Sequence, residues 1–153
     1  RMSARLAVAL SQGTEKQENT MGRFAESIGI AFQIQDDILD IVSSGSDRKK
    51  FGKAFGNDIK EGKRTLMVIH ALGKAPQTDR NRLIQILNSH TSDPKMTDEA
   101  ISILGKYNSI EYAKQKAKQL VLDAWKNTEP LLKDSNAKKK LKDFAYFLIE
   151  RDF

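Results

Sequence analysis

The sequence contains no cysteine, which excludes disulfide bonds and metal sites built on thiolates. Only three prolines interrupt it, namely Pro76, Pro94 and Pro130. No apolar stretch approaches the ~20 residues that a membrane-spanning helix requires, and the chain has no internal repeat and no low-complexity segment. These absences favour a globular, water-soluble protein without stable membrane insertion, and we expect it to be cytoplasmic.

The residues that are present favour helices throughout. Of the 153 residues, 39% are hydrophobic and 30% are charged, and Lys, Glu, Ala, Leu and Gln, which are good helix formers, are abundant. Apolar positions recur at spacings of three and four, which is typical of amphipathic helices. The sequence therefore predicts an all-α protein, a bundle of mostly antiparallel helices. We expect helices over residues 1–11, 16–42, 63–72, 79–88, 98–106, from 108 or 109 to about 130, and from 136 onward.

Two further local features are predicted. Residues 48–62 are expected to be mostly loop, because glycines punctuate them. Thr78 or Asp79 and, further on, Thr97 are predicted as helix N-caps, since their side-chain oxygens can accept a hydrogen bond from a free backbone N–H.

The formal net charge is +6, and a run of lysines carries much of it. The lysines concerned are Lys114, Lys116, Lys118, Lys138, Lys139, Lys140 and Lys142. Nucleic-acid binding is one interpretation of such a surplus, and a solvated helix face is the other. No aromatic residues are interleaved with these lysines in a recognition motif, so we favour the solvated face and expect no nucleic-acid partner.

The most informative segment is residues 32–40, FQIQDDILD, which places Asp36, Asp37 and Asp40 in otherwise apolar surroundings. Residues three and four apart are neighbours on a helix, so Asp36 and Asp37 both lie near Asp40, with Gln33 one turn earlier. Together these groups share about a third of the helix circumference. Clustered carboxylates favour a cation, and oxygen ligands favour a hard ion such as Mg²⁺. A Mg²⁺ that keeps some water ligands is suited to binding a diphosphate.

Such a run of aspartates can equally be a solvated helix face, and the carboxylates alone leave both interpretations open. Residues 52–65, GKAFGNDIKEGKRT, favour a ligand site. Their glycines allow the backbone to approach a ligand closely, and lysines act as point charges for phosphate. Acidic groups for a metal followed by basic groups for a phosphate form a two-part arrangement that a solvated face does not need.

With both segments in view, the chain resembles the C-terminal half of a trans-isoprenyl diphosphate synthase of the polyprenyl synthetase family. FQIQDDILD is similar to the second aspartate-rich motif of that family, and GKAFGNDIKEGKRTL to the lysine loop that follows it. The resemblance implies an isoprenyl diphosphate synthase, a prenyltransferase of isoprenoid lipid biosynthesis. Such an enzyme condenses an allylic diphosphate with isopentenyl diphosphate, and it uses Mg²⁺ to clamp the allylic diphosphate.

The resemblance also assigns roles to single residues. Asp36 is expected to be a direct Mg²⁺ ligand, and Asp37 and Asp40 are expected to bind the ion or its waters. Asp58 is a weaker candidate for ordering metal-bound water. No protein side chain is assigned as a catalytic acid, base or nucleophile.

Three further residues are expected to bind substrate. Gln33 matches the family glutamine that faces the substrate. Lys53 matches the lysine that contacts the allylic diphosphate, and Lys63 matches a second lysine near that site. Lys60 and Arg64 are expected to be solvated.

The first aspartate-rich motif of the family has no counterpart here, because residues 1–31 contain only Glu15, Glu18 and Glu26 as acids. We therefore expect residues 1–153 to be the C-terminal part of a single helical synthase domain, inactive in isolation. Its partner would be the N-terminal half of the same enzyme or a complementary subunit, and we expect an oligomer because homodimers are usual in the family. The alternative is a non-catalytic helical subunit or a regulatory partner of a prenyl synthase.

His70 and His90 each stand alone, without a second histidine or carboxylate at ligand spacing, so neither is assigned a site. Phe32 is either a core residue or part of a hydrocarbon channel, and the sequence leaves both open.

Overall fold

The computed structural model describes residues 1–42 and 56–150. The described elements are α1 (Met2–Leu10), α2 (Glu15–Val42), α3 (Asn57–Lys60), α4 (Leu66–Lys74), α5 (Gln77–Asn88), α6 (Pro94–Lys106), α7 (Ser109–Thr128), the 3₁₀ helix η2 (Glu129–Leu131) and α8 (Asn136–Glu150). No strand occurs in these two ranges, so the all-α prediction is confirmed. Within the same ranges, no helix is both long and apolar enough to cross a membrane.

The chain forms two compact units, which divide α2 and α7 between them. The first unit comprises Arg1–Gln33 and Lys116–Phe153, and the second comprises Ile34–Gln115. The acidic residues of α2 and the segment after it therefore belong to the second unit, whereas Gln33 is the last residue of α2 in the first.

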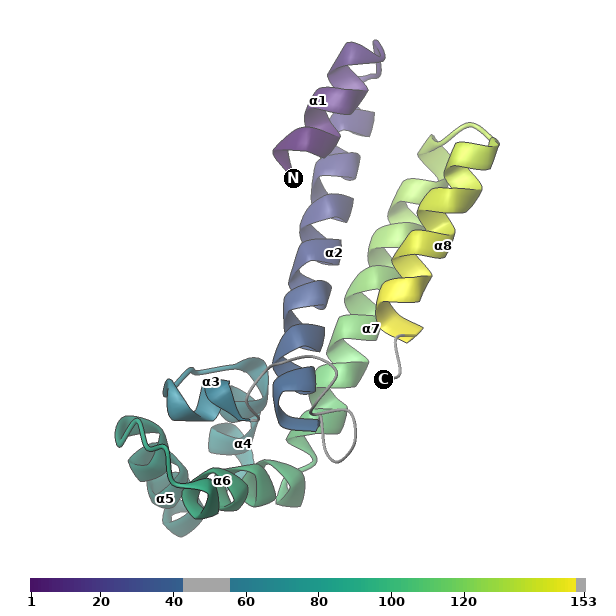
Figure 1. Cartoon of the computed structure of the whole chain (residues 1–153). Helices are drawn as coiled ribbons and strands as arrows, with labels where there is room; N and C mark the ends of the chain where they lie inside the picture. Colours follow the sequence, from purple (N-terminus) through teal and green to yellow (C-terminus); the bar gives the residue numbers. More distant parts are fainter. Residues whose placement is uncertain (43–55, 151–153) are drawn as a thin grey trace. The chain divides into compact units, whose positions relative to one another are not determined.

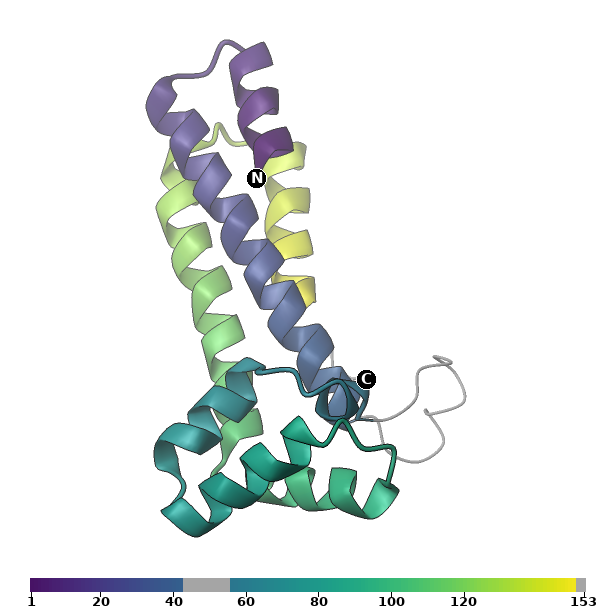
Figure 2. The same ribbon diagram turned by 90° about the vertical axis from the view of Figure 1, so that its left-hand side faces the viewer.

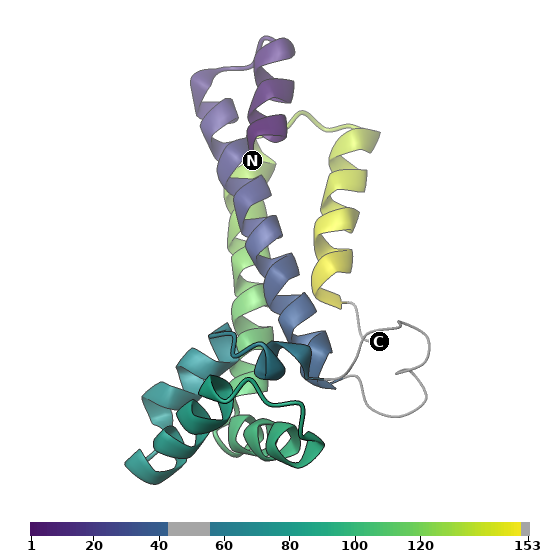
Figure 3. The same cartoon turned by 60° about the vertical axis from the view of Figure 1, so that its left-hand side comes forward.

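In the first unit, α1 runs back antiparallel to the start of α2, and α8 runs antiparallel to α7 (Figure 1, Figure 3). Thr14 and Gln17 form a reciprocal capping box that starts α2: the Thr14 N–H donates to Gln17 Oε1 at 2.8 Å. The Gln17 N–H donates back to Thr14 Oγ1 at 3.3 Å. The edge of Phe24 packs against Trp125 of α7, with the ring centroids 6.0 Å apart. This contact ties α2 to α7 through two large apolar side chains.

In the second unit, α3, α4, α5 and α6 pack with the end of α2 and the start of α7, and α5 lies beside α6 (Figure 2). Their shared core is apolar and almost completely closed to solvent. It includes Ile38, Ile59, Met67, Val68, Leu83, Ile86, Leu87 and Leu104. This core sets the position of α3 relative to α5 and α6.

Two of the predicted N-caps are wrong. Asp93, not Thr97, caps α6, since its side chain accepts a hydrogen bond from the Lys95 N–H at 2.9 Å. Pro94 takes the first helical position, where its missing N–H costs nothing. Thr97 lies inside the helix, buried, and its hydroxyl donates to the Asp93 carbonyl at 3.2 Å.

The start of α5 also differs from the prediction, because the helix begins at Gln77 after Pro76 and no side chain caps it. The Asp79 carboxylate instead accepts hydrogen bonds from Lys106 Nζ at 2.7 Å and Tyr107 Oη at 2.6 Å. These tertiary partners, far along the chain, take the oxygen that a local cap would have used.

Of the loop expected over residues 48–62, the structure describes residues 56–62, and these contain the short helix α3. The helix expected from Lys63 begins three residues later, at Leu66. Thr65 caps α4, because its side chain accepts from the Val68 N–H at 3.5 Å. Lys63 therefore lies in the connection between α3 and α4, and not on a helix.

Candidate functional site

The acidic residues lie on the last two turns of α2. Ile34, Ile38 and Ile41 form the buried face of these turns, and Asp36, Asp37 and Asp40 are half-buried beside it. The helix has no basic residue in its last turn. Negative charge at a helix C-terminus opposes the helix dipole, so this end of α2 is an unfavourable place for three carboxylates unless a cation offsets them.

Asp40 connects the end of α2 to α3. Its carbonyl oxygen accepts a hydrogen bond from the Gly56 N–H at 2.9 Å, and its Oδ2 accepts from the Asp58 N–H at 2.9 Å. The two bonds hold the first turn of α3 against the last turn of α2, so the segment that the sequence associates with the acidic helix does contact it.

The surroundings of the Asp40 carboxyl group disfavour its ionised form. Burial raises its pKa above the usual value, and the nearby negative charge of Asp58 adds to the rise. The hydrogen bond from the Asp58 N–H opposes the shift by stabilising the charged form. A cation bound at this end of α2 would favour the ionised carboxylate, since opposite charge stabilises it.

Lys63 is held by two carboxylates. Its Nζ lies 2.6 Å from Asp58 Oδ1 and 3.0 Å from Glu61 Oε2, and its backbone N–H donates to the Asp58 carbonyl at 2.8 Å. The hydrogen bonds that Lys63 donates to Asp58 and, to a smaller extent, to Glu61 raise its pKa, so the side chain stays charged. The Lys63 side chain is 52% exposed whereas that of Asp58 is only 13% exposed, so the ammonium group remains accessible.

Gly56 and Gly62, which bracket α3, both have positive φ angles, +69° and +67°. A Cβ atom on Gly56 would lie 2.4 Å from Thr97 Cγ2, and one on Gly62 would lie 2.5 Å from the Leu87 carbonyl oxygen. The sequence predicted that glycines here let backbone approach a ligand. At these two positions the structure shows close packing against α6 and α5 instead, which sets the place of α3 and Lys63.

The remaining predicted residues have different outcomes. Lys53 lies outside the described residues. Gln33 is exposed and lies on α2 one turn before Asp36. The core interpretation of Phe32 is wrong, because 48% of the residue is exposed. Arg64 is exposed, as expected of a solvated residue, and its guanidinium also donates to the Gly62 carbonyl and to Asn88 Oδ1, both at 2.6 Å.

Sequence reasoning gave Asp58 a minor role, and the structure gives it contacts with both halves of the candidate site. Asp58 lies between Gly56 and Gly62, five residues before Lys63. This short spacing could have predicted a contact between the side chains of Asp58 and Lys63. His70 has partners outside the site: its Nδ1 lies 3.0 Å from Ser109 Oγ, and its ring stacks on Tyr112.

Across residues 1–42 and 56–150, no group of three or more histidine or carboxylate side chains is arranged so that it could hold a metal ion. Asp36, Asp37 and Asp40 therefore make at most a partial ligand set. Their oxygen atoms suit Mg²⁺, but a complete coordination shell needs further oxygen ligands from water, from substrate or from another segment of protein.

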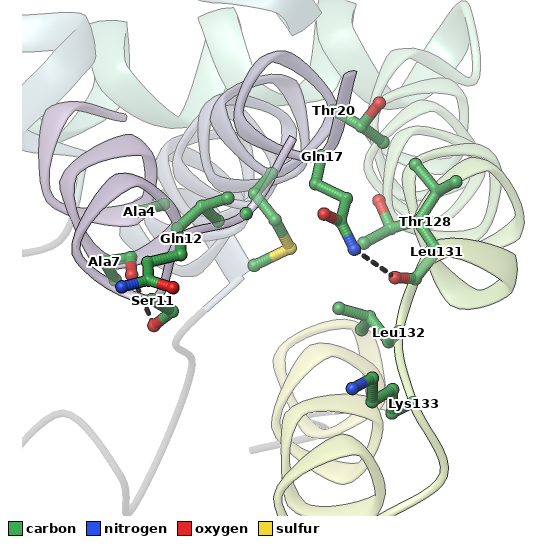
Figure 4. Close-up of a pocket in the computed structure, with 13 residues that line it drawn as sticks. Ala4, Ala7, Ser11, Gln12, Gln17, Thr20, Thr128, Leu131, Leu132 and Lys133 are labelled. Atoms are coloured by element: carbon green, nitrogen blue, oxygen red, sulfur yellow. Dashed lines mark hydrogen bonds between the residues drawn. The ribbon is translucent and has the colours of Figure 1, made fainter. Parts of the chain in front are cut away.

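A separate cavity of about 420 Å³ lies in the first unit, between α1, the start of α2 and the segment around η2 (Figure 4). Its lining is mainly apolar, and Gln17 bridges it by donating from Nε2 to the Leu131 carbonyl at 3.0 Å. No acidic side chain lines it, and Lys133 is the one basic residue of its lining. None of the acidic residues at the end of α2 lines it, so this cavity is not their site.

These observations define an all-helical protein in which an acidic helix end is held against a lysine-bearing turn. The chain belongs to the polyprenyl synthetase family, whose model matches residues 1–104. The sequence-based recognition of trans-isoprenyl diphosphate synthases, with their all-helical fold, is therefore confirmed.

The similarity to individual proteins extends over nearly the whole chain. The chain is 42% identical over 151 residues to a short chain isoprenyl diphosphate synthase of Methanothermobacter thermautotrophicus, covering 98% of this chain and 45% of that protein. A crystal structure of geranylgeranyl pyrophosphate synthetase from Pyrococcus horikoshii superposes with a TM-score of 0.79 at 35% identity, covering 91% of this chain and 41% of that one.

A second similar structure is a geranylgeranyl pyrophosphate synthase of Corynebacterium glutamicum, which was solved in complex with isoprenyl diphosphate and magnesium. Its TM-score is 0.80 at 21% identity, covering 96% of this chain and 41% of that one, so it supports the fold alone. In each of these three comparisons the chain spans less than half the length of the protein it matches.

Proposed function

We propose that this chain supplies the C-terminal half of a cytoplasmic prenyltransferase that condenses an allylic diphosphate with isopentenyl diphosphate in isoprenoid lipid biosynthesis. One observation carries the proposal: the carboxylate of Asp40 and the ammonium group of Lys63 are both bound to Asp58, at 2.9 Å and 2.6 Å. Asp40, on the metal side, and Lys63, on the phosphate side, are thereby both held by the short segment around Asp58.

Within this proposal, the end of α2 is the metal side of the site. Asp36 is the direct ligand, and Asp37 and Asp40 bind the ion or its waters. Bound Mg²⁺ would supply positive charge that neutralises the diphosphate as the C–O bond of the allylic substrate breaks. The acidic side chains of this chain have only to place that charge, since preorganised electrostatics accounts for much of the rate in such reactions.

The lysines form the phosphate side of the site. Lys53 and Lys63 bind oxygens of the allylic diphosphate, and Gln33 faces the substrate. The exposed ammonium group of Lys63, kept charged by its two carboxylate neighbours, supports this role. The N-terminal half of the same enzyme, or a complementary subunit, would provide the opposite wall and the first aspartate-rich motif, and we expect the active form to be an oligomer.

The alternative is a non-catalytic helical subunit or regulatory partner of a prenyl synthase. It is favoured by the incomplete ligand set within the described residues. The catalytic role is favoured by the joint presence of residues that a purely structural subunit does not need, namely Gln33, Asp36, Asp37, Asp40, Lys53 and Lys63.

A reconstitution experiment separates the two functions. We expect the purified 153-residue chain to incorporate no radiolabelled isopentenyl diphosphate, because one carboxylate wall cannot enclose the metal–diphosphate complex. Addition of the N-terminal half of the Methanothermobacter relative, which the chain resembles at 42% identity, should restore condensation. The same mixture with Asp36→Ala in this chain is the matched control and should be inactive.

Each other result has a definite meaning. Condensation by the chain alone would contradict the half-domain proposal. A stable complex of the two halves that remains inactive with every substrate pair would favour the non-catalytic subunit.

A further inference from the structure

Asp58 contacts both sides of the candidate site, and it uses different atoms for each. Its backbone N–H donates to Asp40 Oδ2 at 2.9 Å. Its side-chain Oδ1 accepts from Lys63 Nζ at 2.6 Å, and its carbonyl oxygen accepts from the Lys63 N–H at 2.8 Å. One residue thus sets the position of the Lys63 ammonium group relative to the acidic end of α2.

We infer that Asp58 is a positioning residue, which acts on a bound diphosphate through Lys63 and not as a metal ligand. The inference rests on the proposed function, since it specifies how the phosphate side of that site is built. It gives Asp58 a second role beside the weaker expectation that this residue orders metal-bound water, since Oδ1 is bonded to the lysine.

The number of hydrogen-bond donors on the Lys63 ammonium group supports this role. An ammonium group has three N–H donors, and within the described part of the chain two of them are directed at Asp58 and Glu61. The third is left for an acceptor from outside, such as a phosphate oxygen. Asp58 and Glu61 therefore hold the lysine without using up its capacity to bind a ligand.

Holding the lysine in advance has an energetic consequence. A free lysine side chain loses several rotatable bonds when it binds a ligand, and immobilising such a side chain opposes binding. The short bond to the largely buried Asp58 carboxylate fixes the side chain before the ligand arrives. The packing of Gly56 and Gly62 against Thr97 and Leu87 fixes Asp58 itself.

Inorganic pyrophosphate with Mg²⁺, followed by ³¹P NMR titration of the 153-residue chain, tests the inference. Asp58→Asn keeps the backbone N–H that binds Asp40 and removes only the charge that holds Lys63. We expect it to weaken pyrophosphate binding about three- to tenfold, the loss of one preordered side chain. In a Lys63→Met background the same substitution should change the Kd less than twofold, since Asp58 then has no lysine to position.

The matched control is the exposed ion pair between Asp134 and Lys138, 2.9 Å apart. Asp134→Asn and Lys138→Met make the same changes of charge and should leave the Kd unchanged, alone and together. A second measurement needs no variant at Asp58. The ammonium signal of Lys63 in a ¹H–¹⁵N spectrum, assigned by its loss in Lys63→Met, should exchange slowly with water in the ligand-free parent chain.

Several outcomes would overturn the positioning role and leave the proposed function standing. They are an equal loss from Asp58→Asn in both backgrounds, tighter binding in Asp58→Asn, and rapid exchange of the Lys63 signal. Failure of the parent chain to bind Mg²⁺–pyrophosphate would also overturn the inference, and it would leave the proposed function to the reconstitution experiment, since that function requires the N-terminal half.

Discussion

Two groups of like-charged side chains lie on helices of this protein, and they differ in their burial and in their contacts with the rest of the chain. Asp36, Asp37 and Asp40 at the end of α2 are half-buried, and Asp40 accepts a backbone hydrogen bond from α3. The lysine run at the start of α8 is mostly exposed, and its one described ion pair joins Lys138 to Asp134, four residues away, whose side chain is 97% exposed.

The comparison shows that tertiary contacts, and not charge density, separate a candidate site from a solvated face. The Asp134–Lys138 pair joins a residue just before α8 to one in its first turn, and such a surface ion pair contributes little to stability. A partly buried carboxylate whose pKa is raised by burial is held in an unfavourable state by its surroundings. Such strain at a cluster of like charges points to a ligand that relieves it.

The largest expected effect tests the acidic run directly. In the reconstituted synthase, Asp36→Ala should lower kcat about a hundredfold or more, by analogy with the loss of one preorganised group that stabilises developing charge. Asp40→Ala should have a smaller effect, because the Asp40 carboxylate is already shared with the Asp58 N–H. Lys140→Ala, on the lysine run, is the control and should leave kcat unchanged. Equal small losses in both aspartate variants would contradict the assignment of Asp36 as direct ligand.

The second effect distinguishes a lysine of the site from a lysine of the solvated run. Lys53→Ala and Lys63→Ala should each weaken the allylic substrate about ten- to a hundredfold, since a charge-assisted hydrogen bond is worth about 1.5–3 kcal/mol. Lys139→Ala should change neither KM. Steady-state kinetics of the reconstituted enzyme, with each substrate varied separately, provide the measurement. If isopentenyl diphosphate showed the larger rise in KM, the two lysines would belong to the other subsite.

A third, intermediate effect removes the tertiary support of the site. Gly62→Ala should destabilise the chain by about 1–3 kcal/mol, because a side chain at φ +67° is strained and its Cβ would meet the Leu87 carbonyl oxygen at 2.5 Å. Gly73→Ala, within α4 and with nothing within 4 Å of its Cβ, should instead stabilise by up to about 1 kcal/mol. Urea unfolding measures the free energy of unfolding of both variants. Equal stabilities would mean that the backbone at Gly62 is not constrained as described.

The smallest effect compares the two runs by the sign of their pH dependence. Burial raises the pKa of Asp40 above 3.8, so the folded protein holds this proton more tightly than the unfolded chain. The ionised carboxylate therefore destabilises the fold increasingly as the pH rises through the raised pKa. Asp40→Asn should raise Tm by about 1–3 °C at pH 7 without metal, and the difference should vanish near pH 3.

Asp134 should behave in the opposite sense. Its hydrogen bond from Lys138 lowers its pKa, so its small stabilising contribution is present above the ordinary pKa and is lost as the pH falls. Asp134→Asn should lower Tm slightly at pH 7. A fall in Tm for Asp40→Asn at neutral pH would show that the carboxylate is not strained. Thermal unfolding followed by circular dichroism at pH 3 and pH 7 measures both.

Much of the architecture could be predicted from local signals. The long helix α2, the break between α1 and α2, and the end of α7 at Thr128, two residues before Pro130, follow from apolar spacing, glycine and proline. One error arose where distant residues compete for a local group: Lys106 and Tyr107 take the Asp79 carboxylate from a capping role. The Thr97 error was local, since the nearby Asp93 caps α6 instead. Phe32 was left undecided between core and channel because periodicity cannot say whether an apolar residue meets another helix, and it is exposed in the structure.

The sequence by itself determined the fold class, the acidic segment on a long helix and the family, because helix periodicity and linear motifs are properties of neighbouring residues. Only the tertiary structure decided that Asp40 and Lys63 meet at Asp58. Asp40 lies 18 residues before Asp58 in the chain. Their contact depends on the position of α3, which is set by the close packing of Gly56 against α6 and of Gly62 against α5. That position is set by the packing of a shared core, which no local pattern encodes.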